Sequence, residues 1–169
     1  MNSRFHRPNR VTYDTLVVMP LSTRGKDRAG VAAVEGALIL SALMLLLFVL
    51  LDLGLAVCRY NVLSATARNV ARAAIVRGAD AAPQLSAWGP TAYEGTAADS
   101  SDAAVVASAW LATMNPADVS MQLTWPDGDN QPNHRVSVQL SYSHQFLVSF
   151  LGLGTALPLE SQSTMLISH

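Results

Sequence analysis

Apolar residues are concentrated in one stretch near the N-terminus. The segment Gly36–Leu51 holds 16 mainly apolar residues, and across residues 31–58 the only charged side chains are Glu35 and Asp52. As a helix this segment would span about 24 Å, and its apolar flanks extend it to the ~30 Å of a hydrocarbon core. The pattern predicts a transmembrane helix over residues 31–58.

A helical pattern continues beyond the apolar segment, through residues 59–78. No proline or glycine interrupts residues 61–77, and Gly78 then provides a typical helix stop. The apolar positions lie close to one helical stripe, formed by Val62, Leu63, Ala67, Val70 and Ala74. We expect one helix from about Val31 to Arg77, with its first half in lipid and its second half packed on a small domain.

The remaining residues, 79–169, predict that domain. Residues 79–102 are small, polar and punctuated by proline and glycine, which is typical of a loop. A short helix is expected over 103–114, capped by Ser101 or Asp102.

Strand patterns follow this short helix. Apolar and polar residues alternate over 119–125 and 136–142, with the turn cluster 126–130 between them, which predicts an antiparallel hairpin. Residues 146–153 indicate an apolar loop or short helix, and 157–167 a last strand. The expected fold class is therefore α+β, a long N-terminal helix followed by a small antiparallel sheet.

Charge is distributed unevenly along the chain. Residues 1–30 carry six basic side chains against two acids, whereas residues 78–169 carry one basic side chain, Arg135, against eight acids. A basic flank predicts that the N-terminal side stays in the cytoplasm, as a leader over residues 1–30 that starts at Met1 or Met19. The acidic distal part argues against nucleic-acid binding, which needs a basic face.

No enzyme, metal site or cofactor is expected. The histidines lack a spaced set of carboxylates or cysteines for a metal, and no nucleophile or phosphate-loop motif is present. Asp127-Gly128-Asp129 resembles part of a calcium loop, but no glutamate ends it, so we interpret it as a turn. Cys58 is the only cysteine, and Val57 before it argues against a lipoprotein acylation site, so a free buried thiol is expected.

The start of the apolar segment resembles a known family. The run Arg28-Ala29-Gly30-Val31-Ala32-Ala33-Val34-Glu35-Gly36-Ala37-Leu38 is similar to the N-terminal signature of TadE-like proteins, minor pseudopilins of tight-adherence (Flp-type IV) pilus systems. The acid Asp52 near the end of the membrane segment and the alanine-rich helix after it are similar too. We expect Asp52 to lie at the water boundary, with contact to an arginine of a partner helix as the alternative. Residues 24–78 carry the likeness well, and residues 134–169 carry it loosely.

This resemblance implies that a prepilin peptidase cleaves after Gly30 and frees the amine of Val31. Glu35 would then be the fifth residue of the mature chain and would pair with that amine, in its own subunit or in a neighbour. The alternative is that Glu35 only sits in the headgroup region of an ordinary signal anchor. Small side chains that let helices approach in lipid are Gly36, Ala37, Ser41 and Ala42.

These observations lead to one functional hypothesis and one alternative. The hypothesis is a minor pseudopilin-like component of Tad/Flp pilus biogenesis, anchored in the bacterial inner membrane with its distal domain outside the cytoplasm. Its expected partners are the prepilin peptidase, other pilins or pseudopilins, and pilus assembly proteins. The alternative is an uncleaved single-pass envelope protein whose distal domain binds a partner.

Overall fold

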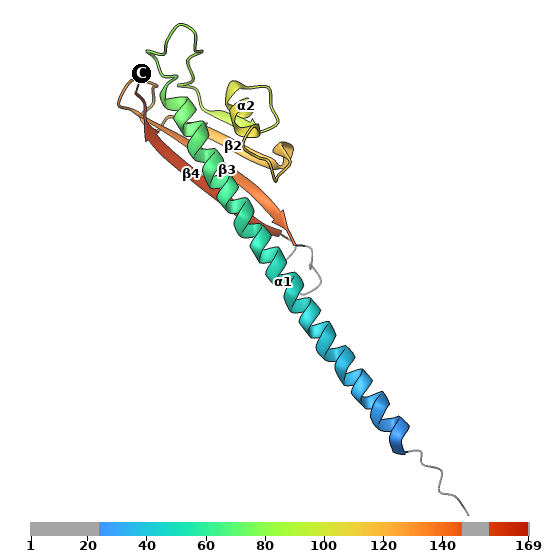
Figure 1. Cartoon of the computed structure of the whole chain (residues 1–169). Helices are drawn as coiled ribbons and strands as arrows, with labels where there is room; N and C mark the ends of the chain where they lie inside the picture. Colours follow the sequence, from blue (N-terminus) through green and yellow to red (C-terminus); the bar gives the residue numbers. More distant parts are fainter. Residues whose placement is uncertain (1–23, 147–155, 169) are drawn as a thin grey trace, which may run out of the picture. The chain divides into compact units, whose positions relative to one another are not determined.

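A computed structural model describes residues 24–146 and 156–168 of the chain (Figure 1). The expected leader up to residue 23 and nearly all of the apolar segment 146–153 lie outside the described residues. The chain divides into two compact units, residues 1–42 and 43–169. The elements in chain order are α1 (Arg24–Ile75), β1 (Tyr93–Thr96), α2 (Asp102–Ser108), the 3-10 turn η1 (Pro116–Asp118), β2 (Val119–Thr124), β3 (Arg135–Gln145) and β4 (Ala156–Leu166).

The long helix α1 is confirmed, with bounds that differ from the expected ones. It begins at Arg24 rather than near Val31, because residues 24–29 contain no proline and include lysine, arginine and alanine, which favour helix. It ends at Ile75, two residues before Arg77. In the second unit one stripe of α1 is buried, through Ala56, Leu63, Ala67, Val70 and Ala74.

The sheet has four antiparallel strands in the order β1-β2-β3-β4. The expected hairpin is confirmed, because β2 pairs with β3 from Val119 opposite Tyr142 to Thr124 opposite Ser137. The expected last strand is confirmed as β4, which pairs with the whole length of β3.

Two expectations for residues 79–114 were wrong. Strand β1 lies in the segment expected to be loop, since its four residues are too few to show alternation and it forms by pairing with β2. Helix α2 is capped by Ser101 as expected, but it ends at Ser108 rather than Met114. After it the chain tightens into turns, where the N–H of Trp110 donates to Ala107 and that of Leu111 to Ser108.

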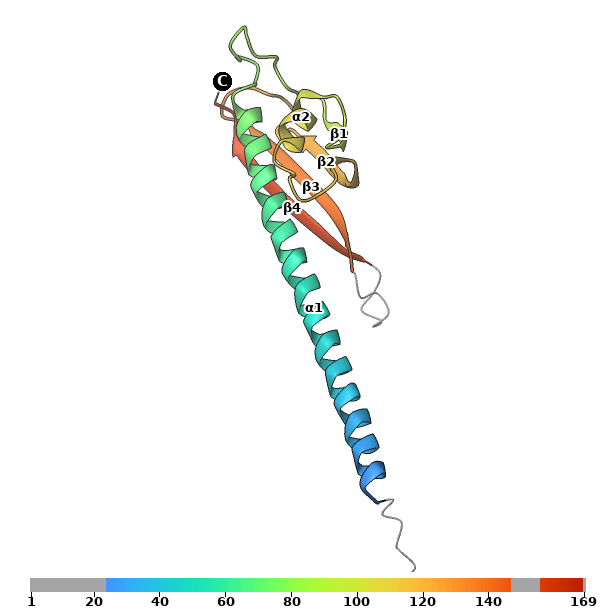
Figure 2. The same cartoon turned by 45° about the vertical axis from the view of Figure 1, so that its right-hand side comes forward.

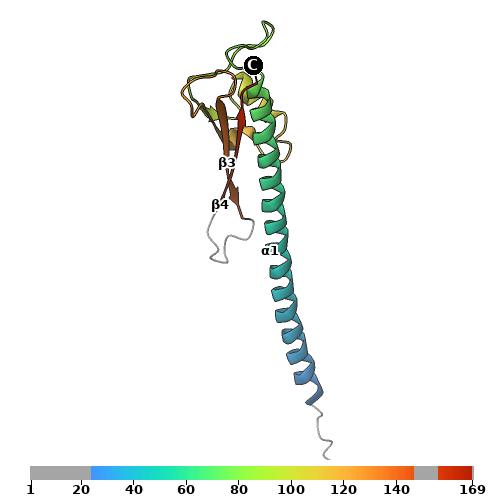
Figure 3. The ribbon, with the colours of Figure 1, turned by 90° about the vertical axis from the view of Figure 1, so that its left-hand side faces the viewer.

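Within the second unit, the sheet and helices form two layers (Figures 2 and 3). Helices α1 and α2 cover one face of the sheet, and the core lies between them. Fully buried side chains of this core include Leu63, Val70, Met121, Val138 and Leu140. The other face of the sheet carries polar side chains, as the alternating burial of β2 shows.

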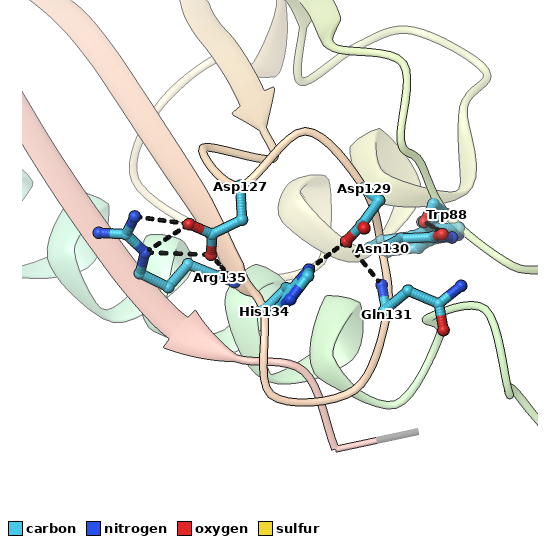
Figure 4. A network of polar contacts seen from close by, with 7 residues as sticks. All are labelled: Trp88, Asp127, Asp129, Asn130, Gln131, His134 and Arg135. Atoms are coloured by element: carbon cyan, nitrogen blue, oxygen red, sulfur yellow. Dashed lines mark hydrogen bonds and ion pairs between the residues drawn. The ribbon is translucent and has the colours of Figure 1, made fainter.

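The β2–β3 turn is held by two side-chain pairs (Figure 4). Arg135 Nη2 lies 2.6 Å from Asp127 Oδ1, and the backbone N–H of Arg135 donates to Asp127 Oδ2 at 2.7 Å. His134 Nδ1 contacts Asp129 Oδ1. Both aspartates of the calcium-loop-like run therefore serve the turn, as expected.

The same turn also fixes the segment that follows α1. The Asn130 amide donates to the carbonyl of Trp88 at 3.0 Å, and the Asn130 carbonyl accepts the N–H of Ala79 at 2.9 Å. Trp88 in turn receives the guanidinium of Arg77 over its ring, 4.5 Å from the centroid. These contacts connect the end of α1 to the start of β3.

Candidate functional site

The residues expected to carry processing and assembly all lie on α1, within the first unit. Gly30, Val31, Glu35, Gly36, Ala37, Ser41 and Ala42 are all exposed. A Cβ added at Gly30 or Gly36 would meet nothing within 4 Å. The Ser41 hydroxyl donates to the carbonyl of Ala37 at 2.7 Å, which satisfies it inside the helix.

Helical spacing places some of these residues together. Val31 and Glu35 are four residues apart and therefore share one face of α1, as do Ala37 and Ser41. Large apolar side chains around them are also exposed, including Leu38 at 68% and Ile39 at 63%. This surface of α1 is apolar and small-residue-rich, with one carboxylate.

By length and composition, α1 could cross a membrane. The candidate span is Gly30–Ile75, and it is the one such helix in the part of the chain that the structure describes. Exposed apolar side chains continue into the second unit, for example Leu47, Phe48 and Leu51.

A polar cluster lies where α1 meets the end of β3, inside the second unit. Arg59 Nη1 donates to His144 Nδ1 at 2.7 Å, and the Arg59 guanidinium lies 5.4 Å from the ring centroid of Tyr142. His144 is fully buried, and Phe146 contacts its ring edge-on at 5.5 Å between centroids. Asp52, on the same stripe of α1 and seven residues before Arg59, is only 3% exposed.

The surroundings of His144 favour its neutral form. Burial lowers the pKa of His144, the positive charge of Arg59 lowers it further, and the charge of Asp52 acts in the opposite direction. Because Arg59 donates to Nδ1, the proton of the neutral ring must be on Nε2. The cluster joins helix and sheet through a hydrogen bond that requires an unprotonated Nδ1.

Sequence reasoning missed this cluster. Asp52 was expected either at the water boundary or against an arginine of a partner helix, but the structure buries it on the stripe that faces the sheet. Asp52 and Arg59 are seven residues apart, which places them on one face of a helix but does not show that this face meets the sheet. No sequence feature near His144 indicates a contact with either residue. Cys58 is free and exposed, so the expected buried thiol was wrong: it lies off the buried stripe.

The aromatic residues of the domain serve mainly its core. Trp88 and Trp125 are each 9% exposed, whereas Trp110 is 54% exposed. A cavity of about 290 Å³ lies beside the two buried tryptophans. At its rim the Ser86 hydroxyl donates to Asp102 at 2.6 Å, and this hydrogen bond lowers the pKa of Asp102. Among the described residues, no group of three or more His, Cys, Asp or Glu could hold a metal ion.

Comparison with known proteins adds one family match. Residues 30–72 match the model of the family TadE-like protein. No curated protein matches the chain, and neither does any solved structure. The match covers the exposed N-terminal surface of α1, the polar residues Asp52 and Arg59, and most of the stripe that packs on the sheet. Over residues 30–72 the chain is thus similar to TadE-like proteins, and the resemblance shown by its sequence is confirmed there.

Proposed function

We propose that this chain is a membrane-anchored component of a Tad pilus assembly system. The observation that carries the proposal is the TadE-like match over residues 30–72, on a helix whose side chains around residues 31–51 are exposed and apolar. Such a surface is stable in lipid or against other apolar helices, and costly in water. The domain of residues 79–169 is then carried by the far end of the anchor.

The orientation in the membrane follows from charge. The basic residues before Gly30 keep that side in the cytoplasm, and the acidic domain lies outside it, so the anchor spans the bacterial inner membrane once. The segments are a leader of residues 1–30, a membrane helix of 31–58, its continuation of 59–78 and the domain of 79–169.

Processing is the finer part of the proposal. A prepilin peptidase cleaves after Gly30 and leaves Val31 as the first residue. Both residues lie within α1, so the peptidase must unwind the helix locally, and glycine is the residue that makes this least costly. Gly30 has no side chain, and a Cβ added there would meet nothing within 4 Å, so no neighbouring side chain covers this position.

Glu35 then acts as an assembly contact. It shares a face of α1 with the new amine of Val31, and its carboxylate is exposed to whatever surrounds the helix. In lipid a lone carboxylate is costly, so pairing with the amine of its own or a neighbouring subunit sets the axial register of the helices. Gly36, Ala37, Ser41 and Ala42 allow close backbone approach beside it.

The mass of the N-terminal peptide tests processing directly. The full chain is expressed in a host with its prepilin peptidase, purified from membranes and analysed by intact mass. A chain that starts at Val31 supports the proposal. An intact leader instead supports the alternative, an uncleaved single-pass envelope protein with a partner-binding distal domain.

A further inference from the structure

The outer face of the sheet, turned away from α1, is formed by polar side chains in cross-strand rows. One row runs across all four strands as Glu94, Gln122, Gln139 and Gln162. The next row runs as Thr96, Ser120, Ser141 and Glu160. We call these two rows the sheet face. Its only charged side chains are the two glutamates, and both are exposed.

The sheet face is hollowed along its row of short side chains. The hollow has a volume of about 340 Å³ and is lined by Thr96, Ser120 and Ser141 together with the longer side chains of Glu94, Gln122 and Gln139. Long glutamines form one wall, and Glu160 follows Ser141 in the row. Hydroxyl, amide and carboxylate oxygens all accept hydrogen bonds. The hollow therefore suits a long side chain with several hydrogen-bond donors, such as arginine.

Two exposed arginines lie on the opposite side of the same unit. Arg68 and Arg72 lie four residues apart on the exposed face of α1, which points away from the sheet. Neither arginine, and neither glutamate of the sheet face, is in an ion pair with another described residue. We call the surface around these two arginines the helix face.

We propose that the sheet face of one copy of this chain binds the helix face of a second copy, with Arg68 and Arg72 directed to the hollow and to the two glutamates of the sheet face. The two faces lie on opposite sides of a two-layer unit (Figure 3). One contact therefore leaves a free sheet face and a free helix face at the two ends, and the contact repeats instead of closing into a dimer. The copies in this lateral repeat are all anchored in the same membrane. The contact goes beyond the proposed function and does not depend on cleavage after Gly30.

Charge-reversal variants of the full chain, purified in a mild detergent, test the contact. One variant reverses the sheet face (Glu94→Arg with Glu160→Arg), and the other reverses the helix face (Arg68→Glu with Arg72→Glu). Wild type is expected to form species larger than a dimer that grow with concentration and dissociate in high salt. Each variant alone is expected to need a concentration about tenfold or more higher, because like charges then face each other.

Mixing separates this contact from general attraction. In an equal mixture of the two variants, the reversed sheet face meets the reversed helix face and the two native faces also meet, so large species reappear. The matched control is Asp80→Arg with Asp118→Arg, which makes the same change in net charge at exposed positions outside the sheet face. Alone, this control keeps both native faces, so it is expected to form large species as wild type does.

A cross-link gives an independent readout. In a Cys58→Ser background, Glu160→Cys and Arg72→Cys chains are mixed and oxidised, and a disulfide-linked pair of the two chains is expected. The proposal is overturned if wild type stays monomeric, or if the control loses its association as far as the sheet-face variant does. It is also overturned if both reversals leave association unchanged, which is the result expected for contact through the membrane helices alone. Binding only to a different envelope protein, with no self-association, also overturns it.

Discussion

Arg59 and His144 are 85 residues apart in sequence and are joined by a 2.7 Å hydrogen bond from Nη1 to Nδ1. The bond connects α1 to the end of β3 at a fully buried histidine. It exists only while Nδ1 of His144 is unprotonated, since the guanidinium can only donate. The packing of the sheet on α1 is thereby coupled to the protonation of one side chain.

The domain should lose stability as the pH falls below about 6.5. The pKa of His144 in the folded chain is lower than its ordinary value of 6.5, so the unfolded chain binds more protons in this range. Stability is fully present above 6.5 and is lost as the pH falls toward the folded pKa. We expect the unfolding midpoint of the full chain in detergent, followed by circular dichroism, to decrease from pH 7.5 to pH 5.

His144→Gln isolates this effect. The amide oxygen of glutamine can accept from Arg59 but does not titrate, so the midpoint of this variant should vary less with pH than that of wild type. His134→Gln is the matched control, because His134 is partly exposed in the β2–β3 turn. An unchanged pH dependence in His144→Gln would show that the hydrogen bond is not the source.

Gly89→Ala should destabilise the domain strongly. Gly89 has φ +87°, and an added Cβ would lie 2.3 Å from the indole of Trp125. Backbone strain of this kind costs about 1–3 kcal/mol, and the clash with a buried ring adds to it. Denaturant unfolding of the full chain measures the loss.

Gly128→Ala separates the two causes. Gly128 has nearly the same φ, +85°, but an added Cβ there meets nothing within 4 Å. It should show the strain alone, so its destabilisation should be clearly smaller than that of Gly89→Ala. Equal losses for the two variants would mean that the packing of Gly89 on Trp125 contributes nothing.

How much of this molecule its sequence predicts depends on the length of each pattern. β2, β3 and β4 alternate over enough residues to be recognised, and α1 has a continuous apolar stripe. β1 has four residues and forms only because β2 offers an edge, so no local pattern could reveal it. The same holds for the Arg59–His144 contact, which depends on the register between two distant elements.

The same distinction between local and long-range patterns applies to the candidate site. The sequence alone predicted where the costly carboxylate Glu35 and the small residues beside it would lie on a helix, because these positions follow from local spacing. It could not predict that the stripe facing the sheet extends to Asp52. That result requires knowing how far β3 reaches along α1, which is set by the 11-residue pairing with β4.

Asp127→Asn should weaken the β2–β3 turn at neutral pH. Hydrogen bonds and charge from Arg135 lower the pKa of Asp127 to about 2, from an ordinary value of 3.8. Its stabilising effect is therefore present above pH 3.8 and is lost as the pH falls through about 2. The unfolding midpoints of variant and wild type should differ at pH 7 and converge near pH 2, and a constant difference across this range would contradict the assignment.

Glu35→Ala should block incorporation into an assembled structure without blocking membrane insertion, if the proposed pairing with the amine of Val31 holds. The apolar segment 36–51 is unchanged in this variant, so the chain should still fractionate with membranes. Removing one partner of a charge pair in lipid leaves the other uncompensated, at about 3–5 kcal/mol, which is roughly a hundredfold or more in occupancy. Glu35→Asp retains the charge on a shorter side chain, so its incorporation should be reduced less. Gly30→Leu tests processing instead and should leave the full-length chain uncleaved. Immunoblots of the membrane fraction and of sheared surface material measure membrane insertion, cleavage and incorporation. Normal amounts of the Glu35→Ala chain in assembled material would refute the role of Glu35, even if cleavage after Gly30 is observed.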